Sequence, residues 1–174
     1  MRKVIVTPFQ TEWKKTFLQE AERVQEVFKE ELITIHHIGS TAVPGLAAKP
    51  TIDMMPVVIS IWQVDLFIKD METLGYIFLG EYGLKGRRYF YKGEDEHTHH
   101  VHIFQKDSDE VKRHLAFRDY LITHPETAEK YGKLKLKLAA QYPNDIAAYI
   151  QGKNNFVKEV EQQALKWYNL QADV

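Results

Sequence analysis

Residues 33–59 read ITIHHIGSTAVPGLAAKPTIDMMPVVI, and this stretch decides the fold. The β-branched residues at 33–37 predict a short strand, and the apolar run 51–59 predicts a second strand that is buried on both faces. Between them, the glycine- and proline-containing segment 39–45 predicts a turn. The stretch therefore predicts two core strands, with a tight turn directly after the first strand.

The connection carries the residue types of a phosphate-binding turn. In Gly39-Ser40-Thr41, glycine permits close approach of a ligand, and the following N–H groups and hydroxyls can hold phosphate oxygens. Lys49 offers a positive charge to the same ligand, or to Asp53. Gly-Ser-Thr is also a common helix cap. The tripeptide therefore fits either of two interpretations, a phosphate-binding turn or a structural cap.

Asp53 is an acid inside an otherwise apolar run. A carboxylate in such surroundings needs a hydrogen-bonding partner or a metal ion. If the two strands are neighbours, Asp53 points toward the site that the turn faces. The alternative is a structural acid that accepts hydrogen bonds from backbone amides near the start of the strand.

A histidine-rich strand is predicted at 99–105. Alternate residues of a strand share a face, so His100 and His102 point one way while His99 and Val101 point the other. Two imidazoles on one face can bind a single divalent ion or place two donors on a phosphate. The alternative is a pair of hydrogen-bonded histidines near a strand end.

Two further residues are candidates for stabilising charge in a reaction. His37 directly precedes the Gly-Ser turn and could reach the site from that side. Arg88 precedes an aromatic stretch and could supply a guanidinium to a triphosphate, with an aromatic ring to stack on a base. Its neighbour Arg87 is the better candidate for a merely exposed position on an edge strand.

The remaining pattern predicts one domain over residues 1–174, with β structure in the middle and a helical part from about residue 107. Lys133 to Leu138 alternates like a strand, but its residue types favour helix. Helices are predicted at 11–31, at 62–74 with Gly75 as a C-terminal cap, and at 107–123. Pro125 begins another helix, a short helical piece starts at Asn144 or Asp145, and a final helix follows. The two remaining predicted strands are 76–79 and 87–92.

Composition excludes several classes of function. The chain has no cysteine, which excludes disulfides and thiolate zinc sites. A formal net charge of -1 gives no general attraction to nucleic acid or to an anionic membrane. No apolar run approaches the length of a membrane span and the N-terminus has no signal-like apolar segment, so we expect a cytoplasmic protein.

The run from His37 to Asp53 resembles the signature of the GrpB family of small bacterial proteins. The similarity continues through Gly75-Tyr76, His100-Val101-His102, Phe117 to Leu121, His124-Pro125, Tyr149, Gly152-Lys153, Phe156 and Ala164-x-x-Trp167. The family is grouped with the nucleotidyltransferase superfamily. The resemblance therefore implies an α+β fold of nucleotidyltransferase type, with a mixed β-sheet, helices packed against it and a helical C-terminal segment.

The resemblance also implies roles for individual residues. The superfamily pattern is a Gly-Ser turn, two acids one residue apart on the following strand, and a third acid on a later strand. By resemblance, Gly39-Ser40 matches the phosphate-holding turn and Asp53 the first acid, but Met55 occupies the position of the second acid. The strand of the third acid corresponds in our alignment to the one with His100 and His102. One aspartate and two histidines can hold one divalent ion, with preference shifted from Mg²⁺ toward Mn²⁺, Zn²⁺ or Ni²⁺, whereas a two-magnesium centre needs more carboxylates.

Three functions follow as hypotheses. The first is metal-dependent transfer of a nucleotidyl group from a nucleoside triphosphate to a hydroxyl, with Mg²⁺, Mn²⁺ or Zn²⁺ as cofactor. The second is a non-catalytic nucleotide- or phosphate-binding module with a degenerate metal site. The third is a metal-dependent hydrolase. Each takes a small-molecule nucleotide as partner, with no membrane and no clear nucleic acid, and the oligomeric state stays open.

Overall fold

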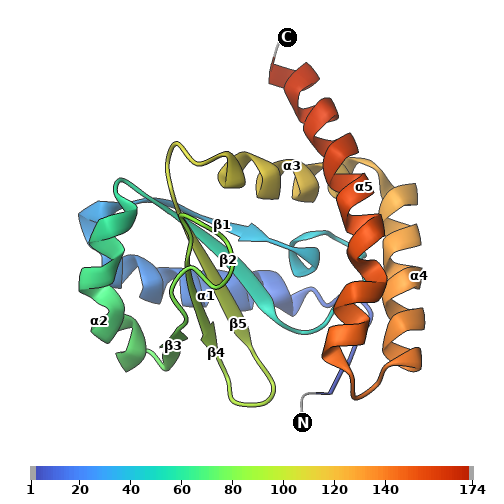
Figure 1. The fold of residues 1–174 in the computed structure, drawn as a ribbon, viewed down its shortest axis with the longest axis horizontal. Helices are drawn as coiled ribbons and strands as arrows, with labels where there is room; N and C mark the ends of the chain where they lie inside the picture. The colour runs from blue at the N-terminus through green and yellow to red at the C-terminus, as the bar shows by residue number, and fades with distance from the viewer. Residues whose placement is uncertain (1–2, 173–174) are drawn as a thin grey trace. The chain divides into compact units, whose positions relative to one another are not determined.

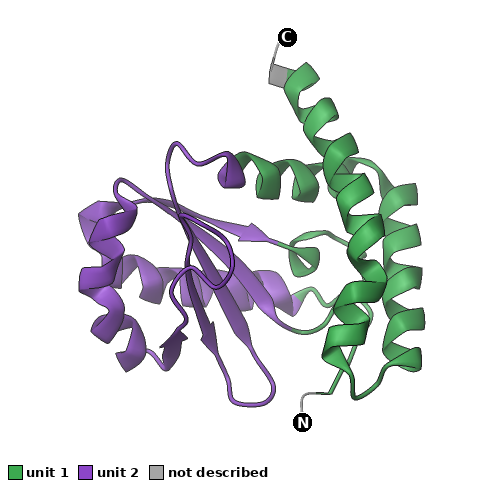
Figure 2. Ribbon diagram, viewed as in Figure 1, with its two compact units in different colours: residues 1–11, 39–50, 112–174 green, residues 12–38, 51–111 purple. Residues whose placement is uncertain are grey.

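The computed structural model describes residues 3–172, and these form two compact units (Figure 2). The sheet unit comprises Glu12–Ile38 and Thr51–Val111. The helical unit comprises Met1–Thr11, Gly39–Pro50 and Lys112–Val174. The expectation of one domain remains a prediction, and each unit is described by itself.

The sheet unit is built on a five-stranded mixed sheet with the order β1-β2-β5-β4-β3 (Figure 1). Its strands are β1 (Leu32–Ile38), β2 (Ile52–Val58), β3 (Tyr76–Phe78), β4 (Arg88–Lys92) and β5 (His99–Gln105). The neighbouring strands β2 and β5 are parallel, and the other three pairs are antiparallel. All five strands begin and end within two residues of their predicted bounds, which confirms the predicted mixed sheet.

One face of this sheet is covered by α1 (Glu12–Phe28), which runs along it in Figure 1. The Phe17 ring of α1 stacks on the His37 ring of β1, with ring centroids 4.6 Å apart. Apolar side chains on this side of the sheet are completely buried, among them Met54, Val101 and Phe90. The amphipathic pattern of the first helix is thus explained by burial of its apolar stripe on the sheet.

The segment predicted as a helix over 62–74 differs from the prediction. It is a 3₁₀-helix, η3 (Ile61–Phe67), followed by the short α-helix α2 (Ile68–Thr73). Ile61 and Val64 are buried, and Phe67 packs edge-on against Phe28 at 5.3 Å. A spacing of three residues matches the three residues per turn of a 3₁₀-helix, so burial of these side chains favours the tighter helix.

The loop from β4 to β5 depends on Gly93. Its φ is +99°, and a Cβ added there would overlap the carbonyl oxygen of Glu96 and lie 3.0 Å from the nitrogen of Thr98. We expect Gly93→Ala to lower the free energy of unfolding by about 1–3 kcal/mol, because backbone cannot yield as a flexible side chain can. Urea denaturation measures this. Gly83→Ala is the control, since Gly83 also has a positive φ but open space around its Cβ; an equal loss in both variants would contradict the packing argument.

The helical unit consists mainly of α3 (Asp109–Thr123), of which the part from Lys112 belongs to it, α4 (Pro125–Gln141) and α5 (Ile146–Ala172). Pro125 occupies the first turn of α4 as predicted, and the Asp145 carboxylate caps α5 by accepting from the Ala148 N–H at 3.0 Å. The helical assignment of 133–138 is confirmed. Among residues 3–172, no helix combines the length and the apolar character needed to cross a bilayer.

The predicted division between a short helical piece and a final helix is wrong, because α5 is continuous. Gly152 lies within it, and a Cβ there would collide with the Leu138 side chain of α4. This glycine therefore serves the close approach of α5 to α4 and does not end a helix. The core of the unit joins the 39–50 segment to the three helices through Val43, Leu46, Leu121, Ala128, Tyr131 and Val160.

Candidate metal centre

Strand register brings an acid and two imidazoles together in the sheet unit. Asp53 of β2 lies opposite His100 of β5, and strand alternation places His102 on the same face. The Oδ1 atom of Asp53 is 3.3 Å from Nδ1 of His100 and 3.2 Å from Nε2 of His102. These three donor atoms all lie within 4.8 Å of one another. Asp53 therefore has the partners that a carboxylate in an apolar strand requires.

The surroundings hold Asp53 and His102 in the protonation states that metals bind. Burial raises the pKa of Asp53, but the hydrogen bonds from His100 and His102 outweigh it and hold the pKa well below its usual range. Burial lowers the pKa of His102, and the neighbouring Asp53 carboxylate offsets this only in part. An ionised carboxylate beside a neutral imidazole is the ligand form that binds a divalent ion.

Arg87 adds a positive charge to the edge of the cluster. Its guanidinium nitrogen lies 3.4 Å from Nδ1 of His102. A guanidinium can only donate, so Nδ1 of a neutral His102 accepts and its proton lies on Nε2, which donates to Asp53. Arg87 also lies 5.0 Å above the Tyr89 ring.

His97 supports His100 from the other side. Its Nδ1 is 2.9 Å from Nε2 of His100, and its ring stacks on Tyr91 with centroids 4.2 Å apart. His100 is therefore held at both ring nitrogens, by Asp53 and by His97. Such partners fix the orientation of an imidazole ligand in metal sites. His97 itself precedes β5 and lies outside the strand predicted at 99–105.

The structure corrects the positions expected for His37 and Arg88. Each lies on the opposite face of the sheet from Asp53, because strand alternation turns both side chains away from it. His37 stacks on Phe17 of α1, and the buried Arg88 pairs with the Asp65 carboxylate at 2.7 Å. Neither is placed to stabilise charge at Asp53, whereas Arg87, the neighbour judged less suitable from sequence, lies beside His102.

Residue 55 lies where a second acid was expected, but it is a methionine and cannot supply a carboxylate. Met55 is two residues from Asp53 on β2, so both face the same side of the sheet. Its side chain has no exposed surface. The cluster described here therefore contains a single carboxylate.

The predicted phosphate-binding residues belong to the helical unit. Gly39 has φ +71°, which favours glycine, and its carbonyl accepts from the Ala42 N–H as a short 3₁₀-turn, η2 (Ser40–Ala42), begins. Thr41 is buried, and the Lys49 ammonium lies 5.6 Å from the centroid of the Tyr149 ring. A phosphate-binding role for these residues stays a prediction.

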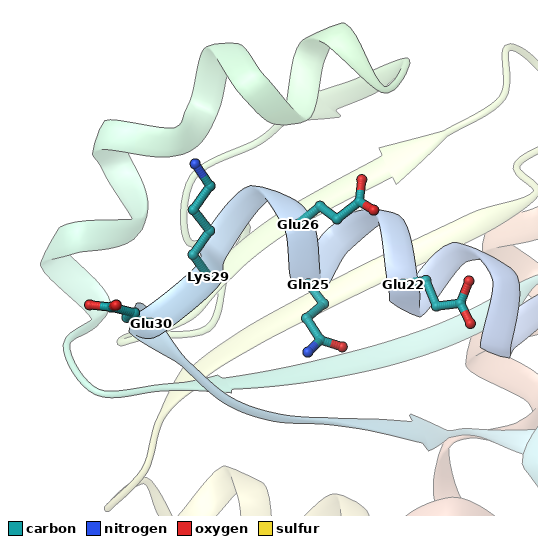
Figure 3. A pocket seen from close by; sticks show the side chains of 5 residues that line it. All are labelled: Glu22, Gln25, Glu26, Lys29 and Glu30. Carbon is teal, nitrogen blue, oxygen red and sulfur yellow. The ribbon is translucent and has the colours of Figure 1, made fainter.

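A separate hollow of about 540 Å³ lies along α1 and is lined by Glu22, Gln25, Glu26, Lys29 and Glu30 (Figure 3). In Figure 3 these side chains project from the helix and its end. The lining is mostly acidic, and it includes none of the residues discussed above. A surface of this charge does not suit an anionic nucleotide.

The fold and the cluster define a class of protein with a carboxylate–imidazole site on a mixed sheet. A sequence model described as "GrpB protein" matches residues 3–163, and the chain belongs to this GrpB family. It is similar to the crystal structure of the conserved protein GrpB from Enterococcus faecalis, with a TM-score of 0.91, 47% identity, and coverage of 94% of this chain and 99% of that one. The resemblance stated from sequence is confirmed.

Among curated relatives, the UPF0157 protein YqkA of Bacillus subtilis is 48% identical over 95% of this chain, which spans only about half (48%) of that protein's length. The glutamate-rich protein GrpB of Alkalihalophilus pseudofirmus is 33% identical over 90% of this chain and 93% of its own. Cid1 poly(U) polymerase matches weakly, with 10% identity and a TM-score of 0.42 over 84% of this chain and 48% of that one.

Proposed function

We propose that Asp53, His100 and His102 bind one divalent metal ion, and that the protein transfers a nucleotidyl group from a nucleoside triphosphate to a hydroxyl. The observation that carries the metal site is the convergence of three donor atoms from adjacent strands within 4.8 Å of one another. Two imidazoles and one carboxylate fit Mn²⁺ or Zn²⁺ better than Mg²⁺, which prefers an all-oxygen shell.

A divalent ion in this position would neutralise phosphate charge and lower the pKa of an attacking hydroxyl. Among the chain's own residues, Arg87 takes the role that the sequence assigned to Arg88. When Nε2 of a neutral His102 is a metal ligand, the ring proton lies on Nδ1, which then faces the Arg87 guanidinium donor. Two donors cannot hydrogen-bond to each other, so the Arg87 guanidinium would then donate to an anion such as a phosphate oxygen.

A phosphate-binding role for the Gly39-Ser40-Thr41 turn and Lys49 of the helical unit is proposed from local backbone shape, because Gly39 adopts a positive φ. Such a bend lets backbone N–H groups approach an anion closely.

A second candidate function is nucleotide or phosphate binding without catalysis. The observation that favours it is the fully buried Met55 at the position of the second acid. Two-metal transfer needs carboxylates that bridge both ions, and one aspartate does not provide them. The two candidates differ in turnover but share the same metal-dependent nucleotide site.

Calorimetry and thermal unfolding of the full chain test the proposal. We expect Mn²⁺ or Zn²⁺ to bind more tightly than Mg²⁺ and to raise the unfolding temperature; a ligand at 100 times its Kd adds about 2.7 kcal/mol. ATP, GTP, CTP and UTP should then bind only when metal is present. Release of pyrophosphate in the presence of hydroxyl acceptors would select the transferase over the binding module. Absence of metal binding, or equal nucleotide affinity in EDTA, would contradict the proposal.

A further inference from the structure

The 79–87 loop between β3 and β4 presents an exposed aromatic ring in a strained backbone. Tyr82 has φ +45°, a left-handed conformation that is rare for residues other than glycine. The residue is 61% exposed to solvent. Backbone strain of this kind costs on the order of 1–3 kcal/mol and persists only where the surroundings enforce it.

Hydrogen bonds within the loop enforce this conformation. The Arg87 guanidinium donates to the carbonyl oxygens of Glu81 and Tyr82, and the Glu81 carboxylate accepts from the Gly86 N–H at 2.8 Å. The loop is also tied to β4, since the Tyr89 N–H donates to the Gly80 carbonyl at 2.8 Å. Tyr82 is therefore held in place before any ligand arrives, which reduces the entropy lost on binding.

The Tyr89 ring lies between the Tyr82 ring and the histidines of the candidate metal centre. It stacks on Tyr89 with centroids 4.9 Å apart and an interplanar angle of 12°. The Tyr89 ring in turn contacts His102 at 5.2 Å and His100 at 5.7 Å. Since one face of Tyr82 lies on Tyr89, its large exposed fraction leaves the other face open to a planar ligand.

We propose that Tyr82 is the residue that stacks on the nucleobase of the nucleotide, with Arg87 contacting its phosphates. This inference rests on the proposed function and adds a binding surface to it. Every nucleobase has a π-face, so stacking on Tyr82 predicts similar affinities for purine and pyrimidine nucleotides. Arg87 connects the two parts, because it anchors Tyr82 through the loop carbonyls and also reaches His102.

The chain offers a matched control in Trp62. It is an aromatic residue of the same unit that is 73% exposed, and the Arg88 guanidinium lies 5.3 Å from its ring centroid. Arg88 points to the opposite face of the sheet from Asp53, so Trp62 carries the same aromatic and cationic pair away from the candidate site.

The test measures the affinity of the full chain for Mn²⁺ alone, Mn²⁺–ATP and Mn²⁺–tripolyphosphate, which lacks a base. We expect Tyr82→Ala to weaken Mn²⁺–ATP by about 5- to 100-fold and to leave the other two affinities unchanged. Tyr82→Phe should bind like the wild type, and Trp62→Ala should have no effect.

Three results would overturn the inference. Wild-type affinity of Tyr82→Ala for Mn²⁺–ATP would remove the stacking role and leave the proposed function standing. An equal loss for Mn²⁺–tripolyphosphate in Tyr82→Ala would show that Tyr82 only maintains the loop. Failure of the wild type to bind any metal–nucleotide complex would remove the proposed function together with this inference.

Discussion

Replacing Asp53 by asparagine is expected to lower the affinity for Mn²⁺ or Zn²⁺ by about 100-fold or more. The substitution keeps the shape of the side chain but removes the carboxylate whose Oδ1 lies 3.2–3.3 Å from both imidazoles. Without it, the two imidazole ligands that remain carry no negative charge to offset a divalent cation. Nucleotide binding that requires metal should disappear with it.

The control for this variant is Asp65→Asn, which removes another partly exposed carboxylate of the sheet unit. Asp65 pairs with Arg88, which points away from the candidate centre, so its loss should leave metal affinity unchanged. Calorimetric titration of both variants and the wild type measures the effect. Equal metal affinity in Asp53→Asn and wild type would show that any bound ion lies elsewhere, and that Asp53 is a structural acid.

The second large effect is expected at Glu20, a buried carboxylate of α1. It accepts from the Lys92 ammonium at 2.7 Å and from the Tyr76 hydroxyl at 2.8 Å, and its side chain is 5% exposed. Glu20→Ala leaves the Lys92 charge without its carboxylate acceptor in a largely buried site. We expect the free energy of unfolding to fall by about 3 kcal/mol, the lower end for a broken buried ion pair, because Lys92 keeps 23% of its surface exposed.

Acid pH should reveal the same interaction. Burial raises the pKa of Glu20, but hydrogen bonds from Lys92 and Tyr76 and the Lys92 charge outweigh it, so its pKa lies below the usual 4.5. A pKa lower in the folded than in the unfolded chain contributes stability above pH 4.5, and this contribution is lost as the pH falls below that value. Glu20→Gln should therefore differ most from the wild type near neutral pH and converge with it in acid.

Urea denaturation across this pH range measures both effects. Glu129→Gln is the matched control, since the Glu129–Lys133 pair has a similar distance of 2.7 Å but is mostly exposed, and its loss should change stability little. A constant difference between Glu20→Gln and the wild type at all pH values would contradict the assigned pKa direction. Equal stability of Glu20→Ala and Glu129→Gln would show that the buried pair contributes nothing.

The sequence alone predicted the elements from which the candidate centre is built. The strands at 33–37, 51–59 and 99–105 and the family signature were readable because β-branched runs and turn glycines are local signals. Alternation placed His100 and His102 on one face, and the apolar run around Asp53 indicated that this acid needs a partner. Those inferences use only neighbouring residues along the chain.

Tertiary structure decided which residues meet. Asp53 and His102 are 49 positions apart, and only the parallel pairing of β2 with β5 brings them to 3.2 Å. The choice between Arg87 and Arg88 depends on which face of β4 lies toward Asp53, and a shift of one residue reverses every side chain of a strand. A local pattern specifies that alternation, but the register between distant strands and the face that α1 covers are set by packing of the whole sheet.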